Sequence, residues 1–204
     1  MKKLIFALIV AAVLWTIMFS PWTACYINFW WMMAFSAVLL ALYTTWVNPT
    51  WWRSLKWKIS EIGWGVVIAA VLWGIFWTGN WIASRIFDFA SSQVDSIYGM
   101  KAGESSWLLA VLLLLLIGPA EEIFWRGYIQ RTLSAFWNPN VGFIVATFLY
   151  ASVHVASCNF MLVMAALVAG GVWGLCYRLF PNHLGALIIS HALWDVAVFL
   201  VFPI

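Results

Sequence analysis

The feature that most constrains this chain is a series of apolar windows, each long enough to cross a lipid bilayer as a helix. A spanning helix needs about 20 residues, and its backbone hydrogen bonds must form within the segment because lipid offers no partners. The windows cover residues 4–20, 26–47, 62–82, 107–131, 141–157, 160–179 and 184–202. They predict an all-α fold, a polytopic transmembrane helical bundle of about seven spans.

The composition supports a membrane protein and excludes a soluble globule. Of the 204 residues, 66% are hydrophobic and 8% are charged, which is too little polar surface for a water-soluble domain. A net charge of +3 is too small to indicate a nucleic-acid partner. No soluble domain interrupts the spans, so we predict that residues 1–204 form a single integral membrane domain surrounded by lipid. A bacterial inner membrane is the expected location.

The basic residues predict an orientation, because the cytoplasmic ends of spans carry an excess of Lys and Arg. Placing Lys2 and Lys3 in the cytoplasm leaves Arg85 and Lys101 outside, which predicts N-in and C-out. The other basic residues then share the cytoplasmic side: Arg53, Lys56, Lys58, Arg126, Arg131 and Arg178. The N-terminal segment is similar to a secretory signal but lacks an A-x-A-like cleavage site, so we expect a retained first span.

Several other features have ordinary structural interpretations. Residues 88–106 are interpreted as a solvated outer loop, and residues 48–60, rich in Trp and basic side chains, as a segment at the headgroups. His183 is expected to be a loop residue, whereas Gly170 and Gly174 predict a close helix contact. Small apolar packing residues, with no metal or disulfide pattern, are expected at Cys25, Cys158 and Cys176.

Ionisable residues inside the predicted spans need an explanation, because each charge at this depth costs about 2.5–3.5 kcal/mol. All of them lie in the second half of the chain: Glu121, Glu122, Arg126, His154, His191 and Asp195. Glu122 and Arg126 are four residues apart, which predicts an ion pair on one helix face. Glu121 points about 100° away from Glu122 and is left without that partner.

Two further helices carry polar pairs at the same spacing. His191 precedes Asp195 by four residues, and Tyr150 precedes His154 by four. In a bundle, these faces and Glu121 would converge on one polar pocket below the cytoplasmic surface. A carboxylate to activate water, an imidazole and donors for an oxyanion are the minimum apparatus for hydrolysis.

At these residues the sequence resembles the CPBP family of intramembrane proteases, also called Abi or type II CAAX endopeptidases. The family motifs EExxxR, FxxxH and HxxxN or HxxxD correspond to "EEIFWR", "YASVH" and "HALWD", within a motif-bearing half of about residues 107–202. The resemblance implies that Glu121 is the general base on a water held jointly with His154. It also implies that His191 and Asp195 stabilise the oxyanion. Supporting roles are implied for Glu122, Arg126 and Tyr150.

Two residues depart from the usual family pattern. Tyr150 stands where the family usually has Phe, and its hydroxyl needs a partner if buried. Asp195 stands where the better-studied eukaryotic members have Asn. Because an ionised carboxylate cannot donate to an oxyanion, Asp195 must be protonated or act indirectly by holding His191 as a charged donor. We favour the indirect role.

The family has been called a metalloprotease, so the possibility of a bound metal ion needs to be considered. The zinc alternative would use Glu121, His154 and His191 as ligands. Zinc proteases, however, bring two histidines together by HExxH, a spacing that this sequence lacks. A glutamate-activated water needs no ion, so we favour a mechanism without metal or other cofactor.

The residues and the resemblance together predict hydrolysis of a peptide bond near the cytoplasmic membrane face. The resemblance implies that this hydrolysis serves CAAX-type processing or bacteriocin or peptide processing. The expected partner is a peptide or protein substrate, with or without a lipid chain. One alternative is a catalytically silent immunity or scaffold protein of the same fold. Another is a proton-coupled transporter, since intramembrane Glu and His also form proton relays. Transporters usually show paired halves, whereas these residues are confined to one half.

Overall fold

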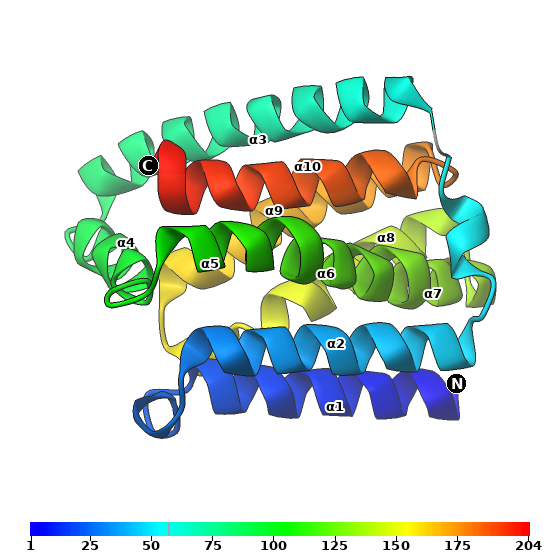
Figure 1. The fold of residues 1–204 in the computed structure, drawn as a ribbon, viewed down its shortest axis with the longest axis horizontal. Coiled ribbons are helices and arrows are strands. Elements are labelled where there is room, and N and C mark those ends of the chain that lie inside the picture. Colours follow the sequence, from blue (N-terminus) through cyan, green and yellow to red (C-terminus); the bar gives the residue numbers. More distant parts are fainter. Residues whose placement is uncertain (57) are drawn as a thin grey trace.

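The computed structural model describes residues 1–56 and 58–204, and its long helices run side by side in alternating directions (Figure 1). Seven helical segments within those residues are long and apolar enough to cross a membrane. They are Lys2–Phe19, Phe29–Val47, Ile59–Ile86, Ser106–Phe136, Pro139–Ser157, Phe160–Leu179 and Leu184–Val201. The same residues contain no β-strand. The predicted all-α bundle of about seven spans is confirmed.

The first three spans are α1 (Lys2–Phe19), α2 (Phe29–Val47) and α3 (Ile59–Ile86). Short 3-10 turns, η1 (Ala24–Tyr26) and η2 (Trp51–Ser54), lie in the connections between them. The predicted headgroup segment contains η2 and also Trp57, which lies outside the described residues. Helix α2 begins where the Asn28 side chain accepts a hydrogen bond from the Trp31 backbone N–H, an arrangement that satisfies a free donor of the first turn.

The fourth span is continuous but irregular. It alternates between α-helix and π-helix, in which each turn contains an extra residue. In order it contains α5 (Ser106–Leu112), η3 (Leu113–Ile117), α6 (Gly118–Phe124), η4 (Trp125–Gln130) and α7 (Arg131–Phe136), with η3 and η4 as the π segments. The π segments flank α6, which carries Glu121 and Glu122. Such segments occur frequently at functional sites.

The last three spans carry the other two motifs. They contain α8 (Pro139–Ser152), η5 (Val155–Ser157), α9 (Phe160–Leu179), α10 (Leu184–Val196) and the π segment η6 (Ala197–Val201). A Cβ built on Gly170 would lie 2.8 Å from the Tyr150 ring, and one on Gly174 would lie 3.1 Å from the Phe143 ring. The predicted close helix contact at these glycines is confirmed, and it joins α9 to α8.

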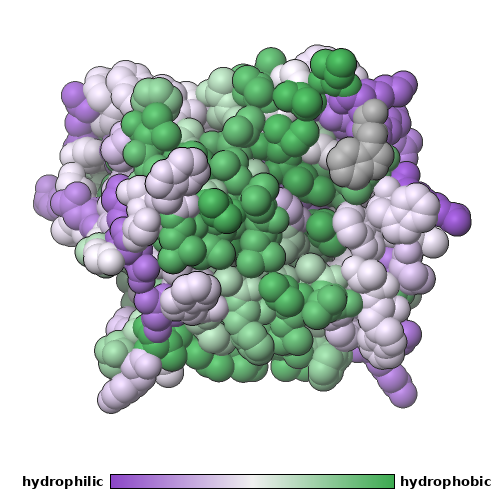
Figure 2. Space-filling view, viewed as in Figure 1, coloured by the Kyte–Doolittle hydropathy of each residue, from purple (hydrophilic) through white to green (hydrophobic). Residues whose placement is uncertain are grey.

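Packing places α6 inside the bundle. It contacts α2 on one side and α10 on another, while α3 packs along α10 and α8 packs along α9 (Figure 1). The visible outer surface is hydrophobic across its middle, and hydrophilic residues gather toward both ends (Figure 2). This is the surface pattern of a bundle that crosses a membrane.

The predicted solvated loop at residues 88–106 is wrong. This connection contains α4 (Ala90–Gly99), which packs against α9. Val94, Ile97 and Tyr98 share one face of α4 by their helical spacing and line an internal cavity. Their apolar pattern was obscured by the polar residues between them, which face outward.

One smaller prediction also needs correction, and another is confirmed with an added contact. Cys25, Cys158 and Cys176 are free, but Cys25 and Cys158 are exposed and do not act as packing residues. His183 does lie in a connection, yet its Nδ1 is 2.7 Å from Oε1 of the buried Glu61. The other Glu61 oxygen accepts the backbone N–H of Ala186. Glu61 therefore ties α3 to the first turn of α10.

Candidate active site

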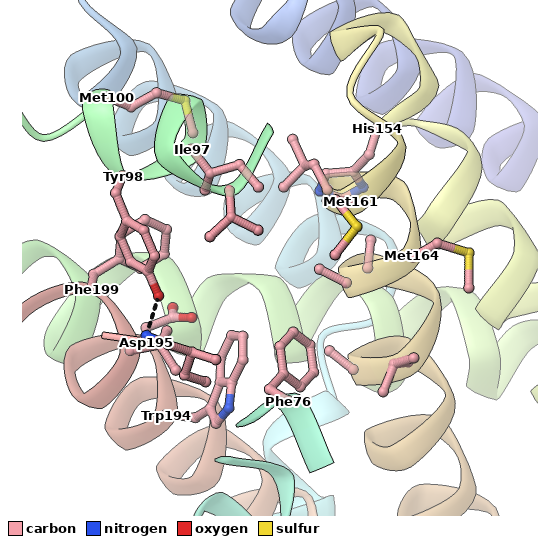
Figure 3. Close-up of a pocket in the computed structure, with 18 of the residues that line it drawn as sticks. Phe76, Ile97, Tyr98, Met100, His154, Met161, Met164, Trp194, Asp195 and Phe199 are labelled. Carbon is pink, nitrogen blue, oxygen red and sulfur yellow. Dashed lines mark hydrogen bonds between the residues drawn. The ribbon is translucent and has the colours of Figure 1, made fainter. Parts of the chain in front are cut away.

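A cavity of about 500 Å³ extends into the bundle from the α4 end. Its walls are mostly apolar, and it reaches the polar side chains Glu121, Tyr150, His154, His191 and Asp195. The structure therefore brings all four predicted catalytic residues and Tyr150 to one space. Figure 3 shows His154 and Asp195 on different walls of this cavity, contributed by separate helices.

Glu121 lies at the deep end of the cavity, and 6% of its surface is exposed. Its Oε2 accepts a 2.9 Å hydrogen bond from the Tyr150 hydroxyl. The hydroxyl that distinguishes Tyr150 from the usual phenylalanine therefore has the partner that a buried phenol needs. The other carboxylate oxygen is free of this contact and is available to a water or substrate in the cavity.

Glu122 and Arg126 form the predicted ion pair, with 2.7 Å between Oε1 and Nη1. Both side chains are buried, and Nη2 of Arg126 also donates to the Gly170 carbonyl on α9. The same Oε1 lies 2.8 Å from Nδ1 of His191, a contact that the sequence did not predict. Glu122 therefore joins the first and third motifs and fixes one edge of the His191 ring.

The His191 ring is held on three sides. Beyond its Glu122 contact, it stacks on Trp173 with ring centroids 3.9 Å apart. Its Nε2 lies 3.6 Å from Oδ2 of Asp195, close enough for an ion pair but long for a hydrogen bond. A ring with carboxylates at both nitrogens is favoured in its charged form, in which both nitrogens are donors. This geometry suits the indirect role of Asp195.

His154 has both ring nitrogens occupied. Its Nδ1 is 2.8 Å from the Tyr150 carbonyl oxygen and so carries the proton as a donor. Its Nε2 accepts a 3.1 Å hydrogen bond from the indole N–H of Trp15 on α1. Trp15 is therefore a site residue that sequence reasoning missed. It carries no signal in the sequence, because it is one of many aromatic residues in an apolar first span.

Comparison with known proteins relates the segment that carries the three motifs to a protein family. Residues 103–197 match the family profile of Rce1-like type II CAAX prenyl endopeptidases. The resemblance seen in the motifs is confirmed over this segment. No curated protein and no solved structure matches the chain. The Rce1-like segment contains all three motifs, whereas α1 with Trp15, α2, α3 and α4 precede it.

The site does not have the arrangement of ligands that the zinc alternative requires. Among the described residues, no three His, Cys, Asp or Glu side chains are grouped to hold a metal ion. In particular, the Nε2 lone pair of His154 is engaged by Trp15. Glu121, His154 and His191 therefore do not fit a zinc ion as they are placed.

The position of the cavity bears on the predicted orientation. Its walls include Phe19 at the end of α1, Phe29 at the start of α2 and Phe87 after the end of α3. All three lie at the α4 end of the bundle, opposite the N-terminus (Figure 1). The outer part of the cavity therefore lies at the end of the bundle opposite the N-terminus.

Proposed function

We propose that this protein is an intramembrane endopeptidase in which Glu121 activates a water for attack on a peptide bond. The match to Rce1-like endopeptidases suggests intramembrane protease activity. The observation that carries the proposal is the Glu121 carboxylate, oriented by Tyr150, in the same mostly apolar cavity as two imidazoles. Little bulk water reaches a carboxylate in such surroundings, so the carboxylate can act as a general base on one water molecule bound beside it.

In this mechanism Glu121 takes a proton from water as the water oxygen attacks the substrate carbonyl carbon. The carbonyl oxygen becomes an oxyanion, which Nε2–H of His191 stabilises, because Glu122 and Asp195 hold that ring charged and in place. Glu121 then passes the proton to the leaving amine, and the C–N bond breaks. No step requires a metal ion.

The decisive experiment compares peptides released from membranes that carry the wild-type protein or Glu121→Gln. The substitution keeps the shape of the side chain but removes the base, so the product peptides should disappear while the purified variant stays folded and monodisperse in detergent. Glu104→Gln, the same chemical change outside the cavity, is the matched control and should retain the products. Full proteolysis in both Glu121→Gln and Glu121→Ala would show that the assigned base is wrong.

One observation favours a second candidate, a catalytically silent immunity or scaffold protein of the same fold. The engagement of both His154 nitrogens leaves that ring with no free acceptor for water. For a silent protein, the released peptides would be identical with wild type, Glu121→Gln and membranes that lack the protein.

A further inference from the structure

We propose that the cavity is entered from the extracytoplasmic side of the membrane, and that its occupant is an apolar peptide segment presented from that side. The identity of the occupant rests on the proposed function, whereas the side of entry rests on charge and geometry alone. In this arrangement the N-terminus is cytoplasmic, as predicted, and cleavage takes place toward the opposite face of the membrane, not near the cytoplasmic face.

The first support is the distribution of basic residues over the two ends of the bundle. Of the ten Lys and Arg side chains, two lie at the α4 end, Arg85 and Lys101. Arg126 is buried in the site. The remaining seven lie at the end that contains the N-terminus: Lys2, Lys3, Arg53, Lys56, Lys58, Arg131 and Arg178. The end with the excess of basic residues is normally cytoplasmic, so the α4 end faces outward.

The second support is that the cavity reaches the molecular surface in this outward half. Residues Ile75, Gly79 and Phe87 line the cavity from α3 and the residue after it, and all three are exposed. Phe160, the first residue of α9, also lines the cavity and is 45% exposed. The mouth therefore lies between α3 and α9, beside α4.

The third support is that the bundle is filled between the site and the opposite end. Arg126 and Gln130 are buried, and they donate to the carbonyl oxygens of Gly170 and Gly174. These bonds join the fourth span to α9 directly beyond the cavity. Trp173, which is fully buried, fills the adjacent space under His191. The described side chains thus form a floor, and the approach to Glu121 is from the α4 end.

The segments that cover part of the cavity opening favour an apolar occupant. Tyr98 on α4 accepts the backbone N–H of Ile204 (Figure 3), and Lys101, just after α4, donates to the Phe199 carbonyl. The α4 segment and the last residues therefore close over part of the opening. Burial raises the pKa of the Tyr98 phenol, with a smaller opposing effect of the Ile204 N–H, so this group is neutral at physiological pH. No charged side chain of the described residues lines the cavity above its polar floor.

The volume limits the size of the occupant. About 500 Å³ falls within the range of roughly 300–1,000 Å³ that binding pockets usually have. Such a space holds a few residues of extended peptide and excludes a folded domain. A substrate must therefore insert an apolar segment between α3 and α9, which brings a peptide bond to Glu121.

Cysteine labelling tests the side of entry without any need for proteolysis. Exposed Cys25 and Cys158 lie at the α4 end and serve as native reporters of orientation. In bacterial spheroplasts, a membrane-impermeant maleimide should label the wild-type protein, and the Cys25→Ser/Cys158→Ser variant should lose that labelling. Labelling of the wild type only after lysis would overturn the proposal.

The cavity itself is tested in a variant with all three native cysteines changed to serine. Gly79→Cys adds a thiol at the mouth, where a Cβ meets nothing within 4 Å, and Asn182→Cys adds one at an exposed position at the opposite end. We expect Gly79→Cys to be labelled in intact spheroplasts and Asn182→Cys only after lysis. The reverse pattern would show a cavity that faces the cytoplasm. Either result stands whether or not the protein proves to be a protease.

Discussion

The hydroxyl of Tyr150 donates a 2.9 Å hydrogen bond to Oε2 of Glu121, and the backbone carbonyl of the same tyrosine accepts Nδ1–H of His154. One residue of α8 therefore orients both the carboxylate and an imidazole of the site. A phenylalanine at this position would keep the second contact and lose the first. Tyr150 thus orients the carboxylate that we propose as the general base, in addition to filling space.

Tyr150→Phe should lower the rate of peptide release by about tenfold and leave the fold intact. A hydrogen bond to a charged group contributes about 1.5–3 kcal/mol, and each 1.36 kcal/mol corresponds to about tenfold in rate. We expect the low end because water in the cavity can replace the lost donor. Tyr177→Phe, which removes a hydroxyl from a buried tyrosine outside the cavity, is the control. Equal rates in the two variants would contradict the positioning role.

Trp15→Phe should raise the rate of peptide release severalfold. The substitution keeps an aromatic ring against Trp125 and removes the indole N–H, so Nε2 of His154 becomes free to hold the attacking water. Trp51→Phe removes an indole N–H that donates to Thr45 outside the cavity, and it should leave the rate unchanged. The ¹⁵N chemical shift of the His154 ring reports the release of Nε2 independently of activity. A rate that falls with Trp15→Phe would mean that Trp15 holds His154 in its working orientation.

The sequence predicted the parts of the site that depend on spacing along one helix. Glu122 and Arg126 pair because residues four apart share a helix face. The contact of Glu122 with His191 spans 69 positions, and that of Trp15 with His154 spans 139. Such contacts depend on how helices are rotated against each other. Each extra residue in a π segment changes that rotation, and no local pattern in the sequence indicated η3 or η4.

The connection that contains α4 is a second feature that local sequence patterns did not indicate. Sequence patterning located the seven spans, because each carries a long apolar run. It missed α4, in which Asp95 and Ser96 separate the inward residue Val94 from the inward pair Ile97 and Tyr98. The helix is stabilised by packing on α9 more than by its own sequence, so its existence became visible in the tertiary structure alone.

Glu122→Gln should destabilise the protein by about 3–5 kcal/mol, the usual cost when one partner of a buried ion pair is removed. Arg126 would remain charged and buried, and His191 would lose its Nδ1 acceptor. The measurement is the midpoint of thermal unfolding in detergent. Arg178→Gln, at a polar contact with Asn140 on the exposed surface, should change the midpoint little. Equal midpoints for the two variants would show that the Glu122 contacts contribute nothing to stability.

Peptide release should persist in the presence of a strong chelator. The proposed steps use Glu121 and His191 without an ion, and Nε2 of His154 is not free to ligate one. The measurement compares release from membranes before and after prolonged treatment with the chelator. The metal-free proposal would be overturned by activity that disappears with the chelator and returns only when zinc is added.

Two adjacent glycines of α9 should respond oppositely to the same substitution. A Cβ on Gly170 would lie 2.8 Å from the Tyr150 ring, whereas a Cβ on Gly171 meets nothing within 4 Å. Gly171→Ala should therefore stabilise the protein by up to about 1 kcal/mol, the difference in helix propensity between the two residues. Gly170→Ala should cost about 1–3 kcal/mol, because the ring must move to relieve the overlap.

The displaced Tyr150 ring would also carry its hydroxyl away from Glu121, so Gly170→Ala should lower peptide release at least as much as Tyr150→Phe does. Gly171→Ala should leave release unchanged. Both variants change one hydrogen to a methyl group on the same helix, so differences in expression or helix propensity cannot separate them. Comparable melting midpoints and rates for the two would mean that α8 and α9 have room to separate, and that the hydrogen bond between Tyr150 and Glu121 does not depend on their close approach.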